Sequence, residues 1–365
     1  MSSVQQQSKK ITLALDAMGG DHAPKAVIAG AAHAIAQNSQ LQFIFCGDET
    51  LIVPLIRSYP ELSGSQIIHT KNIVPADMRP SQALRQGKQS SMRFAIDCVK
   101  EGRADGMISS GNTGALMAMA KLVLRTLPGI DRPAIAALIP TLKGESVMLD
   151  LGANIECTAE NLVQFALMGD AFARAILKKA QPNIGLLNVG SEEMKGHEIL
   201  REAARVLRKG KLPLQFHGYI EGDEITKGVV DVIVTDGFTG NVALKTMEGT
   251  AKACLHYVKS ALTSSFRAKI GAFFAAPALR VLSKKADPRR HNGAMFLGLN
   301  GVAVKSHGGS DEIGFANAIA VTFDLISHRI NQHIIDELSQ YHRNMLKSLG
   351  GEWEGDSEEE EHEEA

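Results

Sequence analysis

Cysteine and aromatic residues are scarce in this sequence of 365 residues. Phe, Trp and Tyr together make up 5% of the chain, and a single residue is Trp. The four cysteines, Cys46, Cys98, Cys157 and Cys254, are far apart and show no CxxC or Cys/His ligand spacing. A zinc site needs such spacing, and these cysteines stand among apolar or small residues. We therefore expect free buried thiols and no metal site.

Long apolar runs are also absent. No stretch of about 18 apolar residues occurs, which speaks against a membrane-spanning helix. The N-terminal sequence MSSVQQQSKK has no apolar segment and does not resemble a secretory signal. Together these absences predict a protein of the reducing cytoplasm.

Four familiar enzyme signatures are missing. The sequence contains no GxxxxGK[ST], no GxGxxG after its first predicted strand, no HExxH and no GxSxG. These motifs bind nucleotide phosphates, bind dinucleotides, hold a catalytic zinc and present a nucleophilic serine, respectively. Their absence speaks against ATP hydrolysis, a Rossmann dinucleotide site, zinc proteolysis and serine hydrolysis.

Charge is unevenly distributed along the chain. The segment from Glu352 to Glu364 holds nine carboxylates and no Lys or Arg, whereas the formal charge of the whole chain is -1. Residues 1–351 therefore carry a net charge of +8. A basic body favours anionic partners such as phosphate, nucleic acid, an acidic protein or an anionic lipid surface. The acidic segment is typical of a solvated, disordered tail.

Short apolar runs alternate with longer amphipathic runs through most of the chain, in which 44% of residues are hydrophobic. Strands are predicted at 11–16, 41–47, 66–70, 105–110, 134–140, 146–152, 183–190, 212–218 and 231–237. Helices are predicted at 24–37, 88–102, 113–126, 159–180, 196–209 and 240–260. This order predicts βα units and a mainly parallel sheet covered by helices. Ligands of such sheets bind beyond the carboxyl ends of the strands.

Glycine-rich loops follow five of the predicted strands, at residues 16–24, 109–115, 150–154, 188–198 and 236–241. The clearest is SSGNTGA at 109–115, because its glycines let backbone N–H groups approach an anion at a helix N-terminus. Any one of these loops alone is better explained as an ordinary βα turn with N-capping residues. We expect all five at one edge of the sheet, where together they favour an anion-binding site.

Lys195 and Asn241 stand within two of these loops. Lys195 is a point cation suited to an anionic substrate or an oxyanion, and Asn241 offers an amide donor. The alternatives are an exposed loop lysine and a helix cap. His22 and His197 are better explained as local hydrogen-bonding residues than as acid–base catalysts.

The segment from Lys259 to Arg290 has eight cations and one acid, so it holds most of the positive excess. Apolar residues at helical spacing form one face, namely Phe266, Ile270, Phe273 and Phe274, followed by Leu279 and Leu282. Pro277 predicts a break between two short helices. Such an amphipathic pair suits an anionic membrane interface or a dimer interface, and the two are compatible. Nucleic acid is less favoured, because no Tyr or Trp interleaves with the cations.

The motifs DAMGGDHAP, SSGNTGALM, DLGAN, GSEEMKG and TDGFTGN occur in this order. As a set they resemble the bacterial acyl-carrier-protein:phosphate acyltransferases of the PlsX family, over about residues 11–348. The resemblance implies a three-layer α/β/α sandwich with a mainly parallel sheet, like isopropylmalate dehydrogenase and phosphotransacetylase, with a protruding amphipathic helical hairpin at 259–290. It also implies a single α/β acyltransferase domain at 11–350, between a disordered extension at 1–10 and the acidic disordered tail at 351–365.

The function that the resemblance implies is transfer of a fatty acyl group from acyl carrier protein to inorganic phosphate. The product, an acyl phosphate, starts phospholipid (phosphatidic acid) synthesis, and no cofactor is implied. The implied assembly is a homodimer, attached peripherally to the inner, anionic face of the cell membrane through the hairpin. A membrane glycerol-3-phosphate acyltransferase is a further possible partner, and no nucleic acid is expected.

Matching the family's motifs points to Lys195 and Asn241 as catalytic residues. Substrate- and phosphate-binding roles are expected for Asp16, Gly19, Gly20, His22, Ser109, Ser110, Gly111, Asn112, Thr113, Asn154, Asn188, Glu193, Asp236 and Thr239. Membrane contact is expected for Phe266, Ile270, Phe273, Phe274, Leu279 and Leu282.

Phosphate needs little activation as a nucleophile. The second pKa of a phosphate monoester is about 6 and inorganic phosphate behaves comparably, so the dianion is abundant at neutral pH. The site must hold phosphate against the thioester and stabilise the oxyanion, so we expect direct, single-displacement transfer. Three alternatives stay open. A phosphotransacetylase would use coenzyme A thioesters, a decarboxylating dehydrogenase would need a nicotinamide and a metal for which no Asp cluster is evident, and a membrane adaptor would leave five polar loops unexplained.

Overall fold

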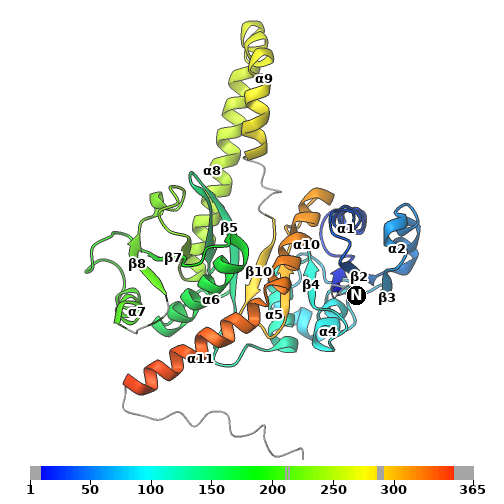
Figure 1. Ribbon diagram of the computed structural model, residues 1–365. Helices are drawn as coiled ribbons and strands as arrows, with labels where there is room; N and C mark the ends of the chain where they lie inside the picture. The colour runs from blue at the N-terminus through cyan, green and yellow to red at the C-terminus, as the bar shows by residue number, and fades with distance from the viewer. Residues whose placement is uncertain (1–9, 210–211, 213, 286–291, 349–365) are drawn as a thin grey trace, which may run out of the picture.

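The computed structural model describes the backbone of residues 10–209, 212, 214–285 and 292–348 (Figure 1). Side chains are described for the same residues except 280–285, 342 and 344–348. The acidic tail at 351–365 and nearly all of the N-terminal extension at 1–10 lie outside the described residues, so both remain predictions.

Eleven strands form one sheet in the order β3-β2-β1-β4-β11-β10-β5-β6-β9-β7-β8. The strands are β1 (Ile11–Asp16), β2 (Leu41–Gly47), β3 (Gln66–His69), β4 (Gly106–Ser109), β5 (Ala134–Thr141), β6 (Gly144–Leu149), β7 (Asn183–Leu187), β8 (Gln215–Ile220), β9 (Val232–Val234), β10 (Ala294–Leu297) and β11 (Val302–Lys305). Nine of them match predicted strands. The sequence prediction missed β10 and β11, because four-residue apolar runs beside glycines carry no clear period.

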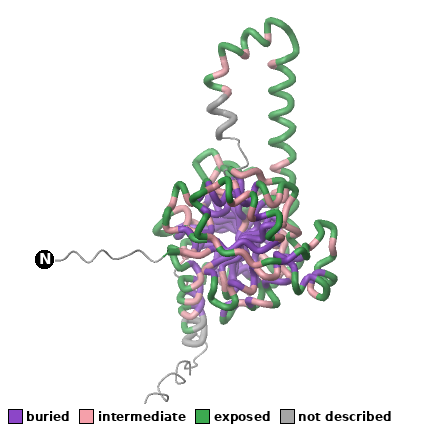
Figure 2. The backbone as a smooth tube through the Cα atoms, turned by 90° about the vertical axis from the view of Figure 1, so that its right-hand side faces the viewer, coloured by how far each residue is buried: buried purple, intermediate pink, exposed green. Residues whose placement is uncertain are grey.

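Helices cover both faces of the sheet, which confirms the three-layer architecture (Figure 1). They are α1 (Lys25–Gln37), α2 (Glu49–Ile56), α3 (Pro80–Gln86), α4 (Ser91–Lys100), α5 (Thr113–Leu124), α6 (Ala159–Leu177), α7 (Glu198–Lys209), α8 (Gly237–Thr263), α9 (Phe266–Lys285), α10 (Glu312–Ser327) and α11 (Ile330–Ser348). Apolar side chains of α1, α6, α7, α10 and α11 pack in one core layer, and those of α3, α4, α5 and α8 pack in the other. The buried residues concentrate around the sheet in Figure 2.

Strand direction reverses in the middle of the sheet. The strands β2, β1, β4 and β11 are mutually parallel, and so are β6, β9, β7 and β8. Antiparallel pairing joins β11 to β10, β10 to β5 and β5 to β6, so the two parallel groups run in opposite directions. The five loops therefore do not all leave in one direction, as was expected for one edge of a parallel sheet. The register nevertheless puts Ile108, Val304, Met295, Ala136 and Leu149 in one row across the sheet, so the carboxyl ends of both parallel groups meet on that row. We call the strand ends of β1, β4 and β11 the first edge, and those of β6, β7 and β9 the second edge.

The amphipathic hairpin protrudes from the body, but it differs from the predicted form (Figures 1 and 2). Its arms are the far part of α8 and the whole of α9, rather than two short helices within 259–290. The helix α9 continues through Pro277, so the predicted break there is wrong. The turn lies at Ser264 and Ser265 instead, where Ser265 Oγ accepts a hydrogen bond from Ala268 N–H at 3.1 Å and begins α9. Among the described residues, no helix is long and apolar enough to cross a membrane.

Two buried carboxyl groups face each other where α11 packs on α6. Arg174 pairs with Asp170 at 2.6 Å and lies 3.7 Å from Glu337. Burial raises the pKa of both carboxyls above their ordinary values, and the neighbouring Asp170 raises the pKa of Glu337 further. One guanidinium serves two buried acids, so the pair favours a state in which at least one carboxyl is protonated.

This pair makes stability fall as pH rises. The folded protein must release protons from groups whose pKa values are raised, a cost that the unfolded chain does not bear. We expect Glu337→Gln to reduce the loss of unfolding free energy between about pH 5 and about pH 8.5 by on the order of 1–2 kcal/mol. Thermal unfolding of the wild type and of Glu337→Gln across this pH range measures the difference in unfolding free energy. Parallel curves for wild type and variant would contradict the assignment.

Candidate active site

At the first edge, hydrogen bonds of two buried side chains, Asp16 and Ser109, fix the loops after β1 and β4. Ser109 Oγ donates to Asp16 Oδ2 at 2.6 Å and accepts from Gly111 N–H at 3.0 Å. Burial raises the pKa of Asp16, although the hydrogen bond from Ser109 opposes this shift. Both side chains are fully buried under the loop. Their position favours a role in fixing the shape of the loop after β4, rather than direct contact with a ligand.

Asn112 begins α5. Its Oδ1 accepts from Ala115 N–H at 2.9 Å, while Nδ2 donates to the carbonyl oxygens of Ala76 and Met78 at 2.9 and 2.8 Å. This amide is therefore occupied by the protein itself. Thr113 is exposed beside it at the helix N-terminus, Ser110 is buried, and Gly19, Gly20 and Gly111 are partly buried.

A third strand end, absent from the sequence-based prediction, completes this edge. The strand β11 lies beside β4 and ends at Lys305, and the chain continues through Ser306 and His307 to a glycine pair. Lys305 Nζ donates to the carbonyl oxygens of Ser110, at 3.3 Å, and of Ser306. The sequence signal was VKSHGGSD, a sixth glycine-rich strand end with hydroxyl residues, overlooked because its strand was not recognised.

At the second edge, Asp150 organises the loop after β6. Its Oδ1 accepts from Gly152 N–H at 3.2 Å and Ala153 N–H at 3.0 Å, and its Oδ2 accepts from Asn154 N–H at 2.7 Å and Asn154 Nδ2 at 2.9 Å. Burial raises the pKa of Asp150 and these donors lower it. Asn154 is buried, and its carbonyl oxygen accepts from Gly237 N–H at 2.7 Å. The loops after β6 and β9 are thus joined directly.

Asp236 begins α8 by accepting from both the N–H and the Oγ of Thr239 at 2.8 Å. Asn241 follows within the first turn of the helix, close to Gly152, and is exposed. Phe238 and Val242 are also exposed and share a face of α8 with Asn241 by their i, i+3 and i+4 spacing. An amide donor therefore stands between two apolar side chains.

The loop after β7 carries the other predicted catalytic residue. Asn188 is buried and donates to the carbonyl oxygen of Lys195 at 3.2 Å, which closes the loop. The Lys195 side chain is 55% exposed, with its Nζ 4.0 Å from Glu192 Oε1. Glu193 is exposed and pairs with Arg208 of α7 at 2.9 Å. Lys195 and Asn241 therefore lie in segments that follow the neighbouring strands β7 and β9, the first in a loop and the second in α8.

The helix α8 begins where the two groups of loops meet. It starts beside Asp150, and Lys245, one turn beyond Asn241, is near enough for its charge to lower the pKa of Lys305 at the end of β11. The residues predicted for the site thus lie on two groups of strand ends that meet on one row of the sheet.

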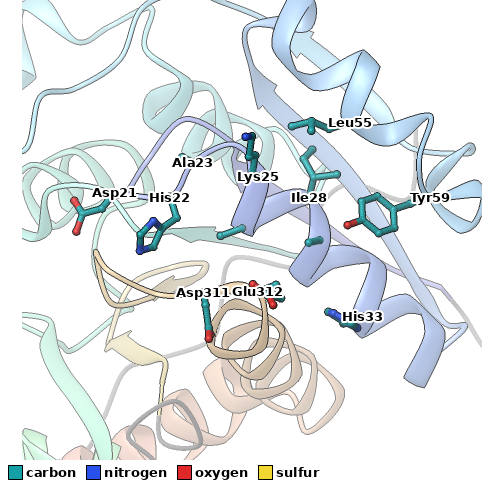
Figure 3. Close-up of a pocket in the computed structure, with 12 residues that line it drawn as sticks. Asp21, His22, Ala23, Lys25, Ile28, His33, Leu55, Tyr59, Asp311 and Glu312 are labelled. Carbon is teal, nitrogen blue, oxygen red and sulfur yellow. The ribbon is translucent and has the colours of Figure 1, made fainter.

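His22 stands in the loop after β1, in the first group. With Asp21 it lines a cavity of about 800 Å³ between α1, Tyr59 and the start of α10, in which Asp311 and Glu312 lie opposite (Figure 3). His197 is exposed just before α7, and its carbonyl oxygen accepts from Leu200 N–H at 3.1 Å. Within the described ranges, no group of three or more His, Cys, Asp or Glu residues could hold a metal ion.

Comparison with known proteins gives consistent relatives. Residues 11–333 match the family model described as "Fatty acid synthesis protein". "Phosphate acyltransferase" from Rhodospirillum centenum is 57% identical over 91% of this chain and 94% of its own length. The protein of the same name from Rhodospirillum rubrum is 53% identical over 91% of this chain and 96% of its own length.

Solved structures resemble the fold at low sequence identity. A phosphotransacetylase from Streptococcus pyogenes has a TM-score of 0.60 at 18% identity, and covers 88% of this chain and 95% of its own. EutD phosphotransacetylase from Staphylococcus aureus has a TM-score of 0.57 at 17% identity, and covers 87% and 94%. These likenesses confirm the predicted phosphotransacetylase-like fold.

Gly240 tests the packing that places Asn241. A Cβ at this position would overlap the carbonyl oxygen of Asp150, which is fixed backbone, so we expect Gly240→Ala to lower the free energy of unfolding by about 2 kcal/mol or more. Gly249 on the same helix is the matched control, because its Cβ would meet no described atom within 4 Å. Gly249→Ala should stabilise the protein by about 0.5–1 kcal/mol. Equal effects in denaturant titrations would refute the close packing.

Proposed function

This chain belongs to the fatty acid synthesis protein family, and on that premise we propose that it transfers a fatty acyl group from acyl carrier protein to inorganic phosphate. It is an acyltransferase, as its 57% identical relative named phosphate acyltransferase indicates. The proposed product is the acyl phosphate that begins phosphatidic acid synthesis. In the reaction, a phosphate oxygen bonds to the thioester carbonyl carbon, the carbon–sulfur bond breaks, and the carrier leaves as its thiol.

The observation that carries this proposal is a set of glycine-rich loops whose neighbouring thiol, that of Cys157, is a poor nucleophile. Cys157 is the cysteine next to the second-edge loops, with Sγ 3.7 Å from Asn154 O. Burial, and then the charge of Asp150, raise its pKa to about 11. A thiol that stays protonated at neutral pH does not accept the acyl group readily. This supports direct attack by phosphate.

Lys195 and Asn241 are proposed to act on the thioester oxygen. As the carbon becomes tetrahedral, negative charge develops on that oxygen, and a cation and an amide donor stabilise it. Their place on neighbouring strand ends and the exposure of both side chains support this role. The remaining polar residues of the two edges are proposed to hold phosphate and the loops that bind it.

Apolar side chains around this pair support an acyl substrate. Phe238 and Val242 flank Asn241, and Val189 and Met194 are exposed in the loop that carries Lys195. Isolated exposed apolar residues need no explanation, but four of them beside two polar candidates provide a surface on which an alkyl chain would lie. The basic charge of residues 1–351 suits an acidic carrier protein in the same way.

The hairpin is proposed to attach a homodimer to the inner face of the cell membrane, where a glycerol-3-phosphate acyltransferase would consume the product. Phe273 and Phe274 are 76% and 78% exposed, and Phe266 and Ile270 are exposed on the same helix. Leu279 is partly buried, whereas the side chain of Leu282 lies outside the described set. Exposed apolar residues near Arg267 and Lys269 are the composition that an anionic interface attracts.

The assay that tests the reaction follows acyl phosphate formed from long-chain acyl carrier protein and inorganic phosphate by the purified protein, beside the matching coenzyme A thioester. We expect phosphate-dependent product chiefly from the carrier-protein donor. Better use of short coenzyme A esters would identify a phosphotransacetylase instead. No product from either donor would refute the proposal.

Two variants separate direct transfer from a covalent acyl-enzyme in the same assay. Lys195→Ala should lower kcat by about 10²–10³, because one electrostatic contact to the oxyanion is lost. Cys157→Ala removes the neighbouring thiol and should retain nearly full activity. The direct mechanism fails if Cys157→Ala abolishes turnover, and the role of Lys195 fails if its variant keeps wild-type kcat.

Vesicle binding tests the hairpin. The double variant Phe273→Ser and Phe274→Ser should bind phosphatidylglycerol vesicles at least about tenfold more weakly than wild type, because burial of two phenyl rings is lost. Leu142→Ser, at a residue 87% exposed in the turn between β5 and β6, is the matched control. Sedimentation of both proteins reports the dimer. Unchanged vesicle binding with loss of the dimer would assign the hairpin to the subunit interface alone.

A further inference from the structure

Lys305 is the only Lys or Arg whose residue is buried in the part of the chain that the structure describes, with 9% of its surface exposed. It ends β11 and stands in register with Ser109 of β4. Lysine is almost never buried without a partner for its charge, because taking an ammonium out of water is costly. Its retention at the end of a central strand therefore needs a physical reason.

The hydrogen bonds of Lys305 tie two functional loops together. Its Nζ donates to the carbonyl oxygens of Ser110 and Ser306, and the N–H of Ser306 donates to Ser109 O at 3.0 Å. Two carbonyl oxygens use two of the three ammonium donors. The ammonium therefore lies where the loop 109–113 contacts the loop 306–310.

The first-edge loops are close-packed around this junction. Asp21 N–H donates to Gly308 O at 2.9 Å, and a Cβ on Gly20 would lie 2.7 Å from Ser110 Cβ. Asn292 holds the third loop by donating to Ser306 Oγ at 2.8 Å and accepting from His307 N–H at 2.8 Å. The three loops form a fixed unit, so a charge placed within it has a defined position.

The buried ammonium lacks a contacting counter-charge. Asp16 and Asp21 raise its pKa through their charges, but the hydrogen bonds of the Lys305 ammonium in the described part of the chain go to backbone carbonyl oxygens. Burial is the largest effect, and together with the smaller effect of the Lys245 charge it lowers the pKa of Lys305 to about 8. The group is therefore still mainly protonated at neutral pH, in a site whose charge an anion would balance.

We propose that Lys305 is a phosphate-binding residue, whose ammonium supplies the positive charge opposite inorganic phosphate held by the first-edge loops. The inference rests on the proposed function, since phosphate is the acyl acceptor there. Phosphate would lie against Ser110, Thr113 and the glycine pair after His307. The thioester would then approach along α8, where Asn241 stands one turn from Lys245.

Steady-state kinetics of Lys305→Met test this assignment, because methionine preserves length and removes charge. We expect KM for inorganic phosphate to rise by about 10- to 100-fold, the usual effect of losing a hydrogen bond to a charged group, with KM for the acyl donor within about twofold. Lys305→Arg keeps the charge and should retain most phosphate affinity. Lys227→Met, at an exposed lysine paired with Asp223, is the control for removal of a lysine elsewhere.

A role limited to holding the two carbonyl groups predicts a different result. Loss of loop packing would lower kcat or stability and leave KM for phosphate unchanged, which would overturn the inference. Thermal unfolding of each variant identifies misfolding. If Lys305→Met does not fold, the pH dependence of Lys305→Arg decides, because KM for phosphate in wild type should rise above about pH 8 and stay flat in the arginine variant.

Calorimetric titration with inorganic phosphate alone separates this inference from the proposed function. Wild type should bind phosphate and Lys305→Met should bind at least about tenfold more weakly, whether or not acyl phosphate is formed. Equal phosphate affinity in both proteins would refute the role of Lys305 even if the transfer reaction is demonstrated. Absence of transfer with a Lys305-dependent phosphate site would instead refute the proposed reaction.

Discussion

Antiparallel hydrogen bonding of β5 with both β10 and β6 reverses the strand direction at the centre of the sheet. The two parallel groups on either side therefore run in opposite directions, yet the register places the carboxyl end of β6 level with those of β4 and β11. The loops of both groups consequently meet near the centre of the sheet. The helix α8 begins at this meeting point, beside the Asp150 loop, and Lys245, one turn beyond Asn241, lies near Lys305.

Buried carboxylates shape the loops at both edges. Asp16 acts through Ser109, and Asp150 binds the N–H groups of its own loop directly. Both carboxyls have raised pKa values because of burial, so their hydrogen bonds offset a real desolvation cost. These two carboxylates can matter for ligand binding without touching the ligand. They fix the positions of the loop N–H groups that are proposed to bind it.

The hairpin shows how local capping decides where helices end. Pro277 is a strong helix-breaking signal because it lacks a backbone N–H and crowds the preceding turn, yet α9 continues through it. Ser264 and Ser265 make the turn instead, since Ser265 satisfies the N–H of Ala268 at the start of α9. The apolar face at Phe266, Phe273 and Phe274 consequently lies on one continuous helix that projects away from the body.

The sequence by itself determined the alternation of strands and helices, the family resemblance and the start of α5, because period, glycine placement and N-capping are local properties. It also brought Lys195 and Asn241 forward as candidates. Only the tertiary structure decided which strand ends meet, since strand direction and register depend on pairing between distant segments. The same pairing places Lys305 beside Ser110, 195 positions away in sequence, and so buries the ammonium of a lysine in an unrecognised four-residue strand among the first-edge loops.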